Sequence, residues 1–183
     1  MKNILILSLI LLLISPPTVA LTSDPGSLPL VQIEVLEYQG AFIIPSSLYG
    51  ESRADGAAGP MEYNPANHSL FFSGNFTHGA VAEFSIPALV NSTDVTALNT
   101  GAVLQNFRRV LHQTPDSNPQ RIDRVTGLKL FNGKLIVNGV RFYDASADNT
   151  HTTLVVENAN DLANSAISGY YQLQGAAHIA GWI

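Results

Sequence analysis

A strand–turn–strand unit occurs twice in this chain, and this repeat constrains the fold more than any other feature. Residues 127–139 (GLKLFNGKLIVNG) place the dipeptide Asn132-Gly133 between two apolar runs. Both residues tolerate the positive φ angles of a type I′ hairpin turn. Residues 59–74 (GPMEYNPANHSLFFSG) have the same order with a longer turn. The repeat predicts antiparallel hairpins rather than helices.

Each hairpin is followed by two more segments with strand-like sequence, so each unit has four expected strands. In the first unit we expect strands at residues 61–63, 69–74, 80–87 and 103–107. In the second unit we expect them at residues 128–131, 134–140, 152–157 and 170–173. Leu70 and Leu135 occupy corresponding positions, 65 residues apart (135 minus 70). Four short strands that recur at such a period are typical of a β-propeller, and an antiparallel sandwich is the alternative.

Three segments carry a resemblance to a known group of proteins. The order GAFIIP, then YNPANHSLFFSG, then VAEFSIPALV resembles the start of secreted, propeller-like bacterial proteins of unassigned function. The resemblance covers residues 38–90 and carries no known catalytic residues. It implies an all-β, β-propeller-like fold with four-stranded antiparallel blades.

The end of the chain looks like the start of a third unit. Residues 180–183 (AGWI) resemble the beginnings of the two earlier units, at residues 58–61 and 126–129. The chain would then hold two blades and the start of a third. Propellers have at least four blades, so we expect the N-terminal part, or a fragment, of a longer propeller.

The first 29 residues predict export and a linker. Lys2, the apolar run at residues 4–14 and a Pro-rich stretch have the layout of a signal peptide over residues 1–20. A membrane anchor is the alternative, but that run is shorter than the roughly 20 residues that a spanning helix needs. Residues 21–29 read as a flexible linker and residues 30–183 as the incomplete propeller domain. We expect a secreted or periplasmic protein with no membrane span after signal cleavage.

Two further strands are expected near the start of the domain. Residues 31–36 alternate between the two faces of an expected strand. The resemblance to propellers implies that an early strand closes the ring, and residues 31–38 are the candidate. Residues 41–45 (AFIIP) predict a second short strand that ends at Pro45.

Composition limits the partners and the chemistry. The chain has 9 basic and 14 acidic residues and a net charge of −5, which argues against nucleic acid as a partner. It has no cysteine, which rules out disulfides and thiolate chemistry within this sequence. We predict no cofactor.

The resemblance to propellers implies that the loops between strands two and three, and between strand four and the next blade, share one face. Charged residues concentrate in these loops, although long loops are also charged merely because they are solvated. The candidate ligand-binding residues are Arg53, Asp55, His78, Arg121, Asp123, Arg124, Arg141, Asp144 and His178.

The densest charged run is RRVLHQTPDSNPQRIDR, at residues 108–124. Guanidinium groups suit carboxylate, sulfate or phosphate, so an anionic saccharide or an acidic protein is the expected ligand class. Asp116 and Asp123 could instead pair with these arginines locally, and for this run we favour local pairing.

The sequence gives little indication of a metal site or of a catalytic nucleophile. His78, His151 and His178 fall in loops of the same face, but no metal-binding histidine spacing is present, and we predict no metal. Residues 144–149 (DASADN) offer oxygen ligands for calcium without the glutamate and glycine of an EF-hand. No Gly-x-Ser-x-Gly elbow occurs. The aromatic residues Phe71, Phe72, Phe84 and Trp182 are expected in the core, with a sugar-stacking platform as the alternative.

These observations predict an exported ligand-binding or protein-binding module. The alternative is a propeller hydrolase or lyase acting on a saccharide or lactone, so whether the chain is an enzyme stays open. In an enzyme, carboxylates and histidines should converge at the channel mouth. The residues concerned are Asp55, His78, Asp123, Asp144 and His178.

Overall fold

The computed structural model describes residues 30, 32–57 and 59–172. The chain divides into two units, Met1–Glu37 and Tyr38–Ile183. In the first unit the described part holds a single turn of 3₁₀ helix, η2 (Ile33–Val35). The predicted strand at residues 31–38 is therefore wrong, since no strand forms at residues 32–38. Ile33 and Val35 are 75% and 71% exposed, and apolar alternation makes a strand only where a neighbouring strand pairs with it.

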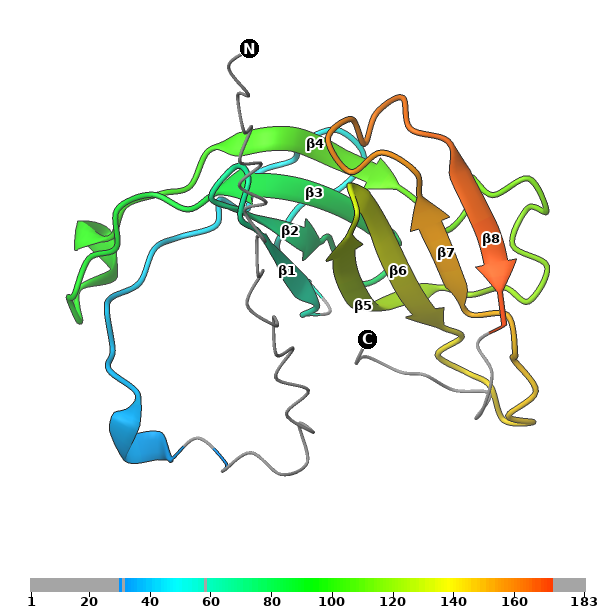
Figure 1. Ribbon diagram of the computed structural model, residues 1–183, viewed down its shortest axis with the longest axis horizontal. Coiled ribbons are helices and arrows are strands. Elements are labelled where there is room, and N and C mark those ends of the chain that lie inside the picture. Colours follow the sequence, from blue (N-terminus) through cyan, green and yellow to red (C-terminus); the bar gives the residue numbers. More distant parts are fainter. Residues whose placement is uncertain (1–29, 31, 58, 173–183) are drawn as a thin grey trace, which may run out of the picture. The chain divides into compact units, whose positions relative to one another are not determined.

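The second unit contains two four-stranded antiparallel sheets. The first sheet consists of β1 (Met61–Asn64), β2 (Ser69–Ser73), β3 (Ala80–Ser85) and β4 (Val103–Arg109). The second sheet consists of β5 (Arg124–Phe131), β6 (Lys134–Val140), β7 (Thr153–Val156) and β8 (Ile167–Tyr171). In each sheet the strands pair in chain order, as Figure 1 shows. The predicted all-β class and the grouping into two sets of four strands are confirmed, although β5 begins four residues earlier than expected (128 minus 124).

The turn between β5 and β6 has the predicted conformation. Asn132 has φ 49° and Gly133 has φ 75°, which are the two positive angles of a type I′ turn. A 3₁₀ turn, η3 (Val95–Ala97), lies between β3 and β4, where Asp94 accepts a hydrogen bond from the backbone N–H of Thr96. None of the described helices is long and apolar enough to cross a membrane.

An apolar core joins the two sheets. Phe71 and Val81 of the first sheet are fully buried against a cluster from the second sheet. The second sheet contributes Leu128, Leu135, Val137, Leu154, Val156 and Ile167 to this cluster. Side chains alternate between the two faces along a strand, so Phe72 lies on the opposite face from Phe71.

The other face of the first sheet has its own small core. Phe84 is 1% exposed and packs edge-on against Phe107 at 5.7 Å and Tyr49 at 6.0 Å between ring centroids. Phe72 also packs against Phe84. The aromatic residues are thus core residues as predicted, but on two faces rather than in one stripe, and Trp182 lies outside the described residues.

Residues 41–51 pair with the β3–β4 connection and, around Gly50, with the edge of β4, without forming a strand. Ala41 bridges to Val90, Ile43 bridges to Thr100, and Gly50 bridges to Phe107. The predicted strand at residues 41–45 is wrong because its residues make isolated bridges to two separate loop positions and so build no continuous ladder.

Polar groups also connect the two sheets. Gln105 of β4 donates to the carbonyl oxygen of Ala159 at 2.8 Å and accepts from the N–H of Leu162 at 2.7 Å. Arg108 donates to the carbonyl oxygens of Leu162 and Ser165. The connection between β7 and β8 is therefore fixed to the outer strand of the first sheet.

Candidate functional site

Several connections between strands meet at one end of the second unit, as the resemblance to propellers implied. Ala57 bridges to Asn75 in the β2–β3 connection. The guanidinium of Arg124, at the start of β5, donates to the carbonyl oxygen of Phe76 at 2.6 Å. Gln120 in the β4–β5 connection accepts from the N–H groups of Thr150 and its neighbour in the β6–β7 connection.

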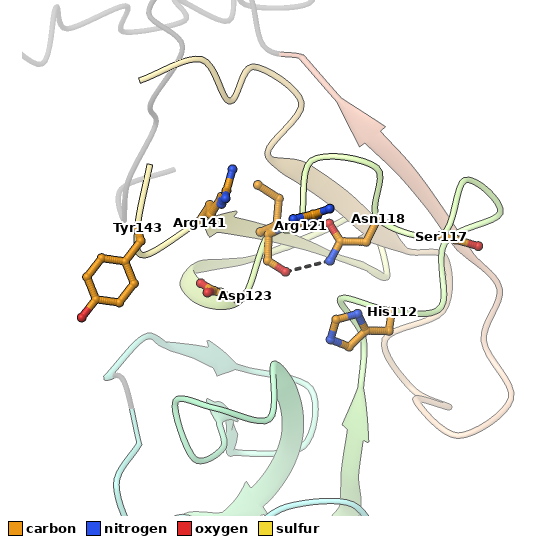
Figure 2. A pocket seen from close by; sticks show the side chains of 8 residues that line it. His112, Ser117, Asn118, Arg121, Asp123, Arg141 and Tyr143 are labelled. Atoms are coloured by element: carbon orange, nitrogen blue, oxygen red, sulfur yellow. Dashed lines mark hydrogen bonds between the residues drawn. The ribbon is translucent and has the colours of Figure 1, made fainter. Parts of the chain in front are cut away.

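A cavity of about 530 Å³ opens between the β4–β5 and β6–β7 connections. We call it the loop cavity; it is lined by His112, Ser117, Asn118, Arg121, Ile122, Asp123, Arg141 and Tyr143. In the view of Figure 2, Tyr143 lies at one end and His112 and Ser117 lie toward the other, with Arg141 and Asp123 between them.

The β4–β5 connection is held by its own hydrogen bonds. Asn118 is 6% exposed, and its carboxamide donates to the carbonyl oxygen of Ile122 and accepts from the N–H of Ile122, both at 2.7 Å. The first of these bonds is the dashed line in Figure 2. Ile122 is fully buried, and a Cβ added to Gly139 of β6 would lie 2.4 Å from its side chain. Ile122, which lies between Arg121 and Asp123, is therefore held by the Asn118 side chain and by close packing against β6.

Arg121 has an uncommon backbone conformation. Its φ is 58°, in the left-handed region, and Ser117 and Asn118 in the same connection have φ values of 53° and 55°. Asparagine tolerates this region, whereas a long side chain such as arginine is disfavoured there. Such strain persists where surrounding structure fixes it, often at binding sites.

The β6–β7 connection is joined to the β4–β5 connection. The side-chain oxygen of Gln120 accepts from the N–H of Thr150 at 2.9 Å and of His151 at 2.8 Å. The side chain of Asn149 donates to the carbonyl oxygen of Gln120 at 3.2 Å. The two walls of the loop cavity are thus fixed to each other.

The charges in the loop cavity are only partly compensated. Among the residues that the structure describes, the guanidinium groups of Arg121 and Arg141 make no ion pair and no hydrogen bond. The carboxylate of Asp123 accepts from the N–H of Phe142 at 2.9 Å and lies 4.0 Å from the guanidinium of Arg124. Two cationic groups are left to interact with a ligand or with solvent.

Arg124 lies between two aromatic rings beside the cavity. Its guanidinium carbon is 4.4 Å from the ring centroid of Phe76 and 4.9 Å from that of Phe142. Cation–π contacts of this kind stabilise a partly buried arginine. The ring of Tyr143 packs edge-on against Phe142, with centroids 4.8 Å apart, and remains 81% exposed.

The structure brings some of the predicted site residues together and leaves others apart. Arg121, Asp123 and Arg141 line the loop cavity, and Arg124 supports its rim. His178 lies outside the described residues.

Two other predicted residues pair with each other. The Arg53 guanidinium lies 2.9 Å from the Asp55 carboxylate, and both side chains are about half exposed. These two charges therefore compensate each other within one loop. In the run at residues 108–124, by contrast, one arginine forms an ion pair within the described residues. This is Arg124, which lies 4.0 Å from the carboxylate of Asp123.

His78 and Asp144 hold loops in place. The His78 ring nitrogen lies 2.9 Å from the hydroxyl of Ser52, which is fully buried. The Asp144 carboxylate accepts from the N–H groups of Asp148 and Asn149, so it caps the segment that offered calcium ligands. Within residues 30, 32–57 and 59–172, no group of three or more histidine and acidic side chains could hold a metal ion.

The sequence reasoning missed the uncharged part of the site. It did not identify His112, Asn118, Tyr143, or the rings of Phe76 and Phe142. One signal was available, because Phe142 and Tyr143 lie two and three residues after the end of β6 within an otherwise polar loop. Two adjacent large aromatic residues in such a loop indicate a contact surface.

Comparison with known proteins adds no assignment. No protein-family model, curated protein or solved structure matches this chain. The residues of the loop cavity offer two guanidinium groups, one imidazole, one carboxylate and an exposed aromatic ring.

Proposed function

We propose that the chain is an exported binding module built from propeller-type blades, and that it binds an anionic ligand in the loop cavity. Two features support the propeller: successive four-stranded meanders with a shared core, and the 65-residue spacing of corresponding residues (135 minus 70). The sequence of residues 1–20 supports export.

One observation carries the binding proposal. Arg121 and Arg141 line the same cavity, and neither guanidinium is neutralised within the described residues. Arg53, Arg108 and Arg124 are all engaged with groups of the fold itself. In a chain of net charge −5, this local concentration of positive charge favours an anion.

Preorganisation of the site adds to the argument. The backbone of Arg121 is held in a left-handed conformation, because its N–H donates to the carbonyl oxygen of Asn118 at 3.1 Å and the Asn118 side chain holds the next residue, so the loop backbone need not be ordered on binding. Guanidinium groups recognise carboxylate, sulfate and phosphate through paired hydrogen bonds.

The test is an NMR titration of the isotope-labelled 183-residue chain with sodium sulfate at constant ionic strength. We expect saturable shifts confined to residues 112–123 and 141–143. The double variant Arg121→Asn, Arg141→Gln should bind sulfate about a hundredfold more weakly, since two charge-assisted hydrogen-bonding groups are lost.

The variant is chosen to keep the fold intact, because asparagine tolerates the left-handed φ of residue 121. Arg53→Gln, which removes an exposed arginine already paired with Asp55, is the matched control and should bind as the unchanged chain does. Unsaturable shifts, or equal affinity in the double variant, would contradict the proposal.

A hydrolase or lyase acting on a saccharide or lactone is the second candidate. Asp123 and His112 line the same cavity and would supply a carboxylate and an imidazole for acid–base chemistry. A mechanism with two carboxylates needs a second acid beside Asp123. Among the described residues that line the cavity, Asp123 is the one acidic side chain. Conversion of a saccharide on incubation with the chain would favour this candidate.

A further inference from the structure

The rim of the loop cavity presents an aromatic ring that the fold leaves mostly exposed. Tyr143 is 81% exposed, although it lines the cavity beside Arg141. Burying a tyrosine side chain is favourable, so exposing one at a cavity rim leaves a surface available for a ligand.

Contacts with neighbouring side chains nevertheless hold Tyr143 in place. Its ring contacts Phe142, whose own ring lies 4.9 Å from the Arg124 guanidinium. The N–H of Phe142 donates to Asp123 at 2.9 Å, and Arg124 is fixed by Phe76. This chain of contacts positions the tyrosine without covering it.

The cavity is larger than a bare anion requires. Its volume of about 530 Å³ is within the range of small-molecule sites, which is roughly 300–1,000 Å³. A ligand that fills it would carry an anionic group for Arg121 and Arg141 and a flat or ring-shaped apolar face for Tyr143. Sugar rings present such C–H faces, and uronic acids carry a carboxylate on the ring.

We infer that the loop cavity binds a uronic-acid residue of a saccharide, with its carboxylate held by Arg121 and Arg141 and its ring stacked on Tyr143. This inference rests on the proposed function and names the ligand class for the same site. Asp123 and His112 are left to accept and donate hydrogen bonds to the sugar hydroxyl groups.

Three ligands test the contributions of the carboxylate and of the sugar ring separately. Trigalacturonate has both the carboxylate and the ring, maltotriose has the ring without the carboxylate, and sulfate has the charge without the ring. Calorimetric or NMR titrations of the 183-residue chain should give affinity in the order trigalacturonate, sulfate, maltotriose.

Tyr143→Ala should weaken trigalacturonate binding about tenfold and leave sulfate binding unchanged, because it removes only the stacking surface. Tyr143→Phe should keep trigalacturonate binding. The exposure of Tyr143 means that its truncation does not disturb the core. Tyr171→Ala, which removes a half-exposed tyrosine of β8, is the matched control and should bind normally.

The outcomes distinguish the two proposals. If Tyr143→Ala binds trigalacturonate as the unchanged chain does while the double arginine variant does not, the stacking inference is overturned and anion binding stands. If maltotriose binds as tightly as trigalacturonate, the carboxylate part is overturned. If neither sulfate nor trigalacturonate binds, the proposed function fails too.

Discussion

At the scale of single residues, Glu83 is the most constrained charged group of the fold. It is 1% exposed and lies on the same face of the first sheet as Phe71, its partner across the strands. Its carboxylate accepts hydrogen bonds from the side chains of Asn64 at 2.9 Å, Asn67 at 3.0 Å, Ser69 at 2.5 Å and Gln105 at 2.5 Å. Burial raises the pKa of this carboxyl, and the hydrogen bonds outweigh it, so the pKa lies below its ordinary value of 4.5.

Glu83→Gln should therefore destabilise the fold by about 1–3 kcal/mol at pH 7, because an amide donor would face donors that are already directed at a carboxylate. Since the pKa of Glu83 is lowered by folding, its contribution is present above pH 4.5 and lost as the pH falls through the lower, folded value. Urea unfolding measured from pH 7 to pH 3 should show this loss in the unchanged chain and a flatter profile in Glu83→Gln.

The control for this prediction is Asp55→Asn, which removes an exposed acid paired with Arg53 and should change stability by less than about 1 kcal/mol. Equal stability of Glu83→Gln and the unchanged chain at pH 7 would contradict the assigned role.

Single residues also explain why only part of the site was foreseen from the sequence. Charge identified Arg121 and Arg141, because a guanidinium in a loop stands out in any sequence. Charge did not separate these from Arg108, whose guanidinium bonds to carbonyl oxygens more than 50 positions away in the chain. Partners at such separations depend on how the sheets pack, and no local pattern encodes them.

At the scale of secondary-structure elements, the strands were predictable where local signals agreed. Asn132-Gly133 fixed the register of β5 and β6, and the alternation of Ala80, Ala82 and Phe84 correctly placed these three side chains together on one face of β3. The segment at residues 31–36 had equally clear alternation and still forms η2. A strand depends on a partner for its hydrogen bonds, and alternation alone does not show whether a partner is present.

The close contact between β6 and the β4–β5 connection gives an element-scale prediction. A Cβ at Gly139 would meet Ile122 at 2.4 Å and the carbonyl oxygen of Arg124 at 2.8 Å. Gly139→Ala should cost about 1–3 kcal/mol in stability, because the connection must move away from the sheet. Thermal or urea unfolding measures this cost.

The same displacement should weaken sulfate binding, since Ile122 lies between Arg121 and Asp123. Gly133→Ala is the control: no atom lies within 4 Å of its added Cβ, so it strains only the turn. It should leave sulfate binding unchanged. Normal binding and stability in Gly139→Ala would show that the connection is not held by this contact.

At the scale of the second unit, the two sheets should unfold together rather than one at a time. They share an apolar cluster, and Gln105 and Arg108 bond the first sheet to the β7–β8 connection of the second. Repeat proteins distribute stability between the intrinsic stability of each unit and the interface between neighbours. Here the interface contains the largest cluster of buried residues, which favours a single cooperative transition.

Phe84→Ala tests this cooperativity because Phe84 belongs to the core on the face of the first sheet that does not contact the second. The substitution should cost about 3–5 kcal/mol. Hydrogen exchange should then show equal loss of protection at Val81 in the first sheet and at Leu135 and Leu154 in the second, since all three amides would exchange through the same global unfolding. Phe84→Leu is the milder variant if Phe84→Ala does not fold. Undiminished protection at Leu135 and Leu154 would mean that the second sheet is stable without the first, and that each four-stranded sheet is an independent folding unit.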